Sequence, residues 1–120
     1  MPSERPAIQS LTIVPRLFPL VLSGEKRSTI RFRETRIVPG PLRYVCDDDA
    51  ALTIVVDVIR CTDMQLSEAA RFLGRAKDWP KEIMLEGMRE HYPDIEWEDQ
   101  VQIIEHHAPA SAPVPDRSGG

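Results

Sequence analysis

The sequence predicts a single α+β domain, in which a curved sheet, open or closed into a small barrel, carries flanking helices. The order of segments supports this: a strand, a short helix, several strands, two helices and a last strand. Runs of strands followed by helices are typical of α+β folds. The chain has 120 residues, of which 42% are hydrophobic, enough for one core. We expect a flexible leader at 1–7, the domain at 8–107 and a disordered tail at 108–120.

Five segments have the composition of strands. They contain β-branched residues, or apolar side chains that alternate with polar ones. The segments are 8–14, 28–33, 42–46, 52–61 and 101–106. In 28–33 small or apolar side chains alternate with Thr29, Arg31 and Arg33. This alternation predicts a half-buried strand with its polar face exposed to solvent.

Three helices are expected, over residues 17–22, 66–73 and 80–92. Gly24 and Gly74 suit the ends of the first two helices. Pro80 suits the first turn of the third helix, with Asp78 as a plausible N-cap. Gly87, inside that helix, costs about 1 kcal/mol relative to alanine.

Composition and charge argue against several classes of protein. A net charge of −4 disfavours nucleic-acid binding through overall charge. No apolar run approaches the roughly 18 to 20 residues of a membrane helix, and the first residues carry no signal region. We therefore expect a cytoplasmic protein that contacts no membrane. A monomer is the expected state, although the sequence does not determine it.

Neither a metal nor another cofactor is expected. The sequence contains no Cys-x-x-Cys pair and no P-loop. His106 and His107 are adjacent on a predicted strand and so point to opposite faces, which argues against a pair of metal ligands.

The basic segment between Lys26 and Arg36 is the candidate for chemistry. It holds five basic residues and one acid, Glu34. A threonine such as Thr29 is a poor nucleophile without an adjacent base. Lys26 can serve as that base if burial and a neighbouring cation lower its pKa, and Arg31 can hold an oxyanion or a phosphate. The spacing also fits ordinary solvated residues on an exposed strand, which is the commoner case.

Residues 21–31 (Val-Leu-Ser-Gly-Glu-Lys-Arg-Ser-Thr-Ile-Arg), followed by Pro39-Gly40 and a strand, resemble the ASCH domain superfamily. Those domains carry a Gly-x-Lys-x-x-Thr-x-Arg-like stretch after a first short helix. The resemblance spans about 11–105 and is clearest at 24–31 and in the helix that ends at Tyr92. It implies a PUA-like β-barrel with flanking helices and a charged cleft.

Within that superfamily, the sequence is similar to small bacterial amidohydrolases that deacetylate N(4)-acetylcytidine. The resemblance implies that Thr29 attacks the acetyl carbonyl, that Lys26 takes its proton and that Arg31 helps to position the substrate. The family also has a glutamate about 15 residues before the tyrosine of the last helix. Asp78 fits that place only with a one-residue gap and a shorter side chain, and Glu86 is the other acid nearby.

The remaining side chains near the motif have ordinary alternatives. Arg33 and Arg36 could extend a binding surface for the substrate, although solvated surface residues are the default. Glu34 is expected to pair with one of these two arginines. Asp78 could be no more than a helix cap, and Glu86 no more than a solvated charge on its helix.

Two alternatives to an amidohydrolase follow from the same resemblance. PUA-like barrels often bind RNA or nucleotides without catalysis, and the local excess of basic residues is consistent with that role. Some ASCH proteins are thought to cleave RNA, although no histidine falls in the motif. The expected substrate or ligand is therefore a modified nucleoside or RNA.

Overall fold

The computed structural model describes residues 8–109. The predicted leader at 1–7 and all but the first two residues of the predicted tail at 108–120 lie outside the described residues. The elements are β1 (Gln9–Ile13), α1 (Phe18–Ser23), β2 (Ser28–Arg31), β3 (Gly40–Cys46), β4 (Asp49–Gln65), α2 (Leu66–Phe72), α3 (Lys81–Arg89) and β5 (Gln100–His106).

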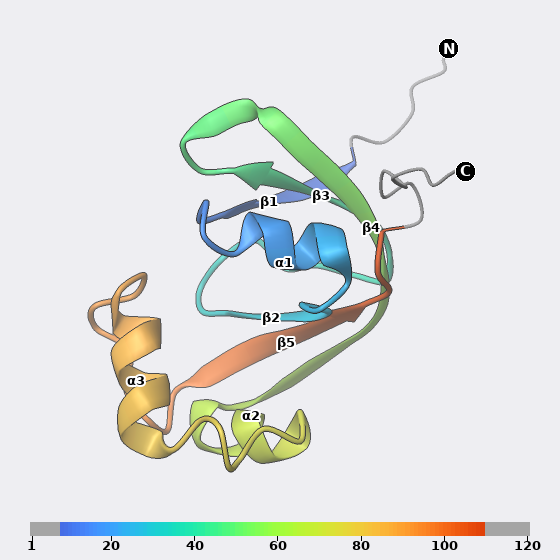
Figure 1. Cartoon of the computed structure of the whole chain (residues 1–120). Helices are drawn as coiled ribbons and strands as arrows, with labels where there is room; N and C mark the ends of the chain where they lie inside the picture. The colour runs from blue at the N-terminus through green and yellow to red at the C-terminus, as the bar shows by residue number, and fades with distance from the viewer. Residues whose placement is uncertain (1–7, 110–120) are drawn as a thin grey trace.

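The five strands form one mixed sheet in the order β1-β3-β4-β5-β2. β1 is parallel to β3, and the other neighbouring pairs are antiparallel. The long β4 strand pairs with β3 through its first part and with β5 through its second, with a register shift between Val58 and Arg60. The sheet curls into a half-barrel (Figure 1), whose edge strands β1 and β2 share no ladder within residues 8–109.

Two apolar clusters stabilise this arrangement. The first fills the half-barrel, where α1 lies in the hollow of the sheet and buries Phe18 and Val21 (Figure 1). The second joins α2 and α3 to β5 at one end of the sheet, around Leu66, Ile95 and Ile103. The predicted α+β class with a curved sheet and flanking helices is therefore confirmed.

The polar face of β2 points inward, contrary to the expectation of an exposed face. Thr29 is only 6% exposed, and the Arg31 side chain is 12% exposed. β2 ends at Arg31, two residues before the predicted end at 33, and Arg33 adopts a left-handed φ of 58°. Because β2 is an edge strand of a curled sheet, its inner face borders the hollow of the half-barrel.

The ends of α1 and α2 follow the sequence, whereas α3 is shorter than the expected 80–92 and spans Lys81–Arg89. Gly24 (φ 86°) and Gly74 (φ 73°) both follow their helices in the left-handed region, as predicted. The N-cap of α3 is Pro80, without a side-chain cap hydrogen bond. Asp78 lies two residues before it, so the prediction of Asp78 as the cap is wrong.

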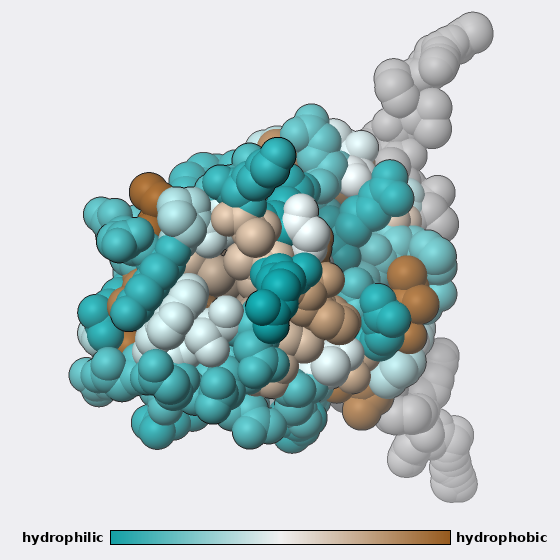
Figure 2. Space-filling view, turned by 90° about the horizontal axis from the view of Figure 1, so that it is seen from below, coloured by the Kyte–Doolittle hydropathy of each residue, from teal (hydrophilic) through white to brown (hydrophobic). Residues whose placement is uncertain are grey.

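The surface is largely hydrophilic. Figure 2 shows the face seen from below, where hydrophilic side chains surround a central strip of paler, less polar residues. The large apolar side chains that are exposed over residues 8–109 are Val38, Leu52, Val55, Ile59, Phe72 and Ile83. No helix in the described part of the chain is long and apolar enough to cross a membrane.

Candidate functional site

A cavity of about 600 Å³ lies between the edge strands of the half-barrel and α3. Its walls include residues of β1, β2 and α3, together with Trp79, His91 and Tyr92. Small-molecule sites commonly have volumes of about 300–1,000 Å³. The cavity therefore has the size of a small-molecule site.

Lys26 lines this cavity and is held by the turn that ends α1. Gly24 turns the chain, and the Lys26 amide then donates to the Leu20 carbonyl at 2.9 Å. The ammonium group donates to the Ser28 carbonyl at 2.7 Å. Burial, reinforced by the charge of Arg31, lowers the Lys26 pKa from 10.5 to about 8. An appreciable fraction of Lys26 is therefore neutral slightly above pH 7, as an acid–base group requires.

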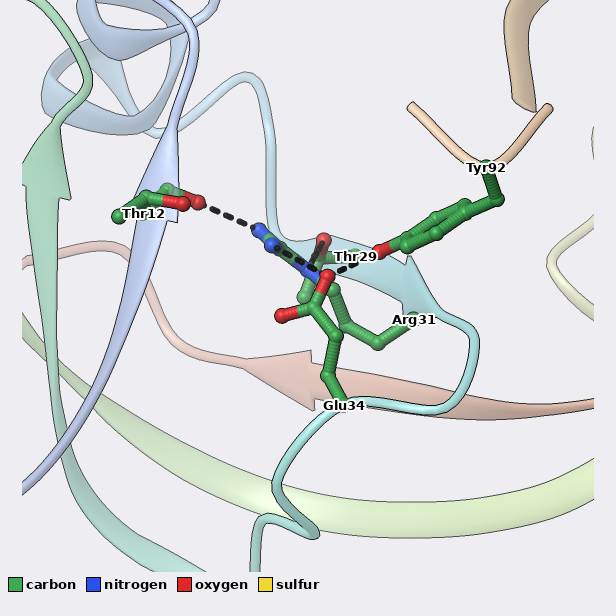
Figure 3. A network of polar contacts seen from close by, with 5 residues as sticks. All are labelled: Thr12, Thr29, Arg31, Glu34 and Tyr92. Carbon is green, nitrogen blue, oxygen red and sulfur yellow. Dashed lines mark hydrogen bonds and ion pairs between the residues drawn. The ribbon is translucent and has the colours of Figure 1, made fainter. Parts of the chain in front are cut away.

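Arg31 connects the two edge strands of the half-barrel (Figure 3). Its Nε donates to the Thr29 hydroxyl oxygen at 2.8 Å. Its Nη2 donates to the Thr12 carbonyl of β1 at 3.0 Å. We call this bridged gap, bounded by Thr12 of β1 and by Thr29 and Arg31 of β2, the seam.

Glu34 is the carboxylate that the fold brings to the seam. It lies 3.5 Å from Arg31 Nη1 and accepts a hydrogen bond from the Tyr92 hydroxyl (Figure 3). Burial, followed by that hydrogen bond, raises the Tyr92 pKa to about 12, so Tyr92 remains a donor at neutral pH. The expected partner of Glu34 was Arg33 or Arg36. That expectation is wrong, because Arg36 pairs with Asp63 at 2.8 Å.

The other predicted site residues lie away from this cavity. Among residues 8–109, neither Asp78 nor Glu86 lines it. The Asp78 side chain is 68% exposed and lies 3.7 Å from Arg75, and Glu86 is exposed on α3. Arg33 is exposed, stacks on the Phe32 ring at 4.7 Å and borders a separate cavity of about 210 Å³. The structure thus brings Lys26, Thr29 and Arg31 together with Glu34.

Two buried polar residues, Tyr44 and His106, lie behind Thr29. No pattern in the sequence singles out Tyr44, and the sequence suggests His106 only as a metal ligand, a role that its place beside His107 argues against. Tyr44 of β3 is 0% exposed and His106 of β5 is 1% exposed, and the Tyr44 hydroxyl lies 3.0 Å from His106 Nε2. The β5 sequence Val-Gln-Ile-Ile-Glu-His does not alternate between apolar and polar residues. The two residues are also 62 positions apart, so no local pattern predicts their contact. Within residues 8–109, no group of three His, Cys, Asp or Glu side chains could hold a metal ion.

Comparison with known proteins finds similarity in fold without similarity in sequence. No protein-family sequence profile and no curated protein sequence matches the chain. Solved structures of ZmASCH from Zymomonas mobilis, in two single-substitution variants, are similar to it with a TM-score of 0.62 and 12% identity. The matches cover 83% of this chain and 68% and 70% of the ZmASCH chains.

These findings define the class of fold. The chain is a curled, five-stranded mixed half-barrel with one helix in its hollow and two at its end. It has an ASCH-like, PUA-like fold, as the motif at 24–31 implied. At 12% identity, the likeness to ZmASCH concerns the fold alone.

Proposed function

We propose that this protein is an amidohydrolase that removes the acyl group from an N(4)-acylated cytidine or a related small amide. One observation supports this most directly. Lys26, whose pKa is lowered to about 8, lines the same cavity as Thr29, whose hydroxyl oxygen is bound by Arg31. A nucleophile and an acid–base group with a pKa near the working pH are what amide hydrolysis requires.

Thr29, Lys26 and Arg31 each have a role in this proposal. Thr29 attacks the acyl carbonyl, and Lys26 supplies acid–base catalysis. Arg31 has five N–H groups, of which three are used by Thr29, Thr12 and Glu34. The other two can stabilise the oxyanion that forms on the carbonyl oxygen.

Glu34 takes the role that the resemblance gives to a glutamate, in preference to Asp78 or Glu86. Its carboxylate lines the cavity and is oriented by Arg31 and Tyr92. It can accept hydrogen bonds from an N–H group of the substrate. Arg33 and Glu86 could contact only those parts of a ligand that extend beyond the cavity, such as a neighbouring nucleotide.

The test is hydrolysis of N(4)-acetylcytidine by the purified protein, followed by chromatography of released cytidine. Thr29→Ala and Lys26→Ala should reduce the rate to background, whereas Thr29→Ser should retain activity. Lys77→Ala is the control, because Lys77 is exposed and outside the cavity. Full activity of Thr29→Ala would exclude Thr29 as the nucleophile. Absence of hydrolysis across a panel of acylated nucleosides would exclude the proposed function.

A binding module without catalysis is the second candidate. Trp79, His91 and Tyr92 line the cavity, and aromatic side chains can stack on nucleobases. If this candidate is correct, cytidine nucleotides or RNA should quench tryptophan fluorescence without being altered. Binding should weaken with added salt and in Arg31→Ala. Cleavage of the RNA during this assay would instead indicate the RNA-cleaving alternative.

A further inference from the structure

Behind the Thr29 hydroxyl runs a buried chain of polar groups that the proposed function does not use. Arg31 Nε donates to Thr29 Oγ1 at 2.8 Å. Thr29 of β2 pairs with Ile104 of β5, two positions before His106, and its side chain interacts with Tyr44 so as to lower the Tyr44 pKa against the larger effect of burial. The Tyr44 hydroxyl lies 3.0 Å from His106 Nε2. His106 Nδ1 lies 2.8 Å from the His107 carbonyl oxygen. The chain therefore leads from the cavity into the interior of the half-barrel.

The direction of each hydrogen bond follows from the groups present. A carbonyl oxygen only accepts, so His106 Nδ1 carries the proton toward His107. The pKa of His106 is lowered, first by burial, with Lys26 and Arg27 acting in the same direction, so the ring is neutral near pH 7. In a neutral ring, Nε2 accepts, and the Tyr44 hydroxyl donates to it. Thr29, which accepts from Arg31, then directs its own proton to Tyr44.

Resting on the proposed function, we propose that Tyr44 and His106 form the proton relay that activates Thr29, and that Lys26 protonates the leaving amine. The ammonium group of Lys26 donates to the Ser28 carbonyl, whereas the Thr29 hydroxyl oxygen accepts from Arg31 and the Thr29 side chain interacts with Tyr44. The proton of Thr29 thus has an acceptor other than Lys26.

In the acylation step, Thr29 Oγ1 bonds to the acyl carbon, and the carbonyl π electrons move to the carbonyl oxygen near Arg31. The Thr29 proton passes to Tyr44 as the Tyr44 proton passes to His106 Nε2. The C–N bond then breaks, and the departing nitrogen takes a proton from the Lys26 ammonium group.

Deacylation returns both groups to their starting states. Water attacks the threonyl ester and gives one proton to neutral Lys26. The C–Oγ1 bond breaks and the carboxylic acid leaves. Thr29 regains its proton from His106 through Tyr44, so one water is consumed and no oxidant or cofactor is needed.

The charged and titratable groups around the acceptor fit this assignment. Those that face His106 are Lys26 and Arg27 before β2, Tyr44 of β3, and His107. Lys26 has given its proton to the leaving amine by the time the acyl-enzyme forms, so of these two cations only Arg27 still repels the protonated His106 ring. Thr29, Tyr44 and His106 are all at least nine-tenths buried, which prevents water from competing for the proton within the relay.

The pH dependence of wild-type kcat/KM distinguishes the relay from direct proton transfer to Lys26. With the relay, His106 must be neutral and Lys26 charged. Activity should therefore rise to a plateau below pH 6.5, the ordinary pKa of histidine, and fall as the pH passes about 8. If Lys26 itself activates Thr29, activity should rise through about pH 8. A rise there would overturn the relay while leaving the amidohydrolase proposal intact.

Tyr44→Phe provides the second measurement, because it removes the relay oxygen and keeps the buried ring. We expect kcat to fall by about 100-fold with little change in KM, the usual size of an acid–base contribution. Thermal unfolding of the variant separates this effect from misfolding. Unchanged kcat in a folded Tyr44→Phe protein would overturn the relay. Absence of activity in the wild type as well would overturn both the relay and the proposed function.

Discussion

The basic segment between Lys26 and Arg36 has two halves with similar side chains and opposite environments. In the first half, the Arg31 side chain is 12% exposed and holds Thr29, the Thr12 carbonyl and Glu34. In the second half, Arg36 is 67% exposed and pairs with Asp63 on the outside. Removing an arginine that is shielded from water and hydrogen-bonded to several groups lowers the free energy of unfolding strongly, whereas an exposed ion pair contributes little to it. The location of a basic residue in the fold, more than its charge, therefore decides its role.

Among the substitutions that test this contrast, Arg31→Ala should cause the largest loss of stability and activity. It leaves Glu34 and the Thr12 carbonyl without their partner across the seam. We expect the free energy of unfolding to fall by about 3 kcal/mol and hydrolysis to be lost. Arg36→Ala, the matched change outside, should cost less than about 1 kcal/mol and leave kcat/KM unchanged. Urea unfolding and steady-state kinetics measure both, and equal losses in the two variants would contradict the contrast.

Glu34→Gln tests the carboxylate of the seam. The amide keeps the shape of the side chain and can still accept from Tyr92, but it loses the charge beside Arg31. We expect a loss of about 1–2 kcal/mol in stability and a fall in kcat/KM. Asp63→Asn, which removes the acid beside Arg36, should change stability by less than about 1 kcal/mol. Unchanged kcat/KM in Glu34→Gln would remove Glu34 from the proposed site.

Lys26→Met should increase stability while abolishing activity. Folding lowers the Lys26 pKa from 10.5 to about 8, so below pH 8 the folded state carries the full penalty of a buried charge. As pH rises from about 8 to 10.5, the folded chain loses its proton before the unfolded chain does, and wild-type stability increases. After loss of the Ser28 hydrogen bond is allowed for, we expect a gain of about 1 kcal/mol at pH 7.

The measurement for Lys26→Met is chemical unfolding at several pH values. The advantage of the variant should shrink between pH 8 and 10.5. Lys77→Met, at an exposed lysine, should change stability by less than about 0.5 kcal/mol at every pH. A gain that is independent of pH would contradict burial of the Lys26 charge.

Gly87→Ala should cause the smallest change in stability, and this change should be an increase, whereas most substitutions destabilise a protein. Gly87 lies inside α3 on the cavity wall, and an added Cβ meets nothing within 4 Å. The methyl group should raise stability by about 0.5–1 kcal/mol and, by narrowing the cavity, raise KM. Gly74→Ala, away from the seam, forces alanine to a φ of 73° and should destabilise by about 1 kcal/mol. Unchanged KM in Gly87→Ala would show that the substrate does not reach α3.

The sequence alone determined the local structure of this protein. Alternation and β-branched residues marked the strands, and the glycines at 24 and 74 marked the ends of two helices. These features depend on neighbouring residues and on intrinsic conformational preference, so they can be predicted without knowledge of the fold. The motif at 24–31 predicted the fold and a charged cleft through its resemblance to the ASCH domain superfamily, and that resemblance can be recognised because the residues of the motif are close along the chain.

Only the tertiary structure decided which face of β2 is inside and which groups meet Thr29. Whether the polar face of an edge strand is solvated depends on how the sheet curls, and the alternation is the same in both cases. The partners of the seam are also distant in sequence: Glu34 and Tyr92 are 58 positions apart, and Tyr44 and His106 are 62 apart. Such contacts arise when strands pair across the chain and a helix packs beside them, which no local pattern encodes.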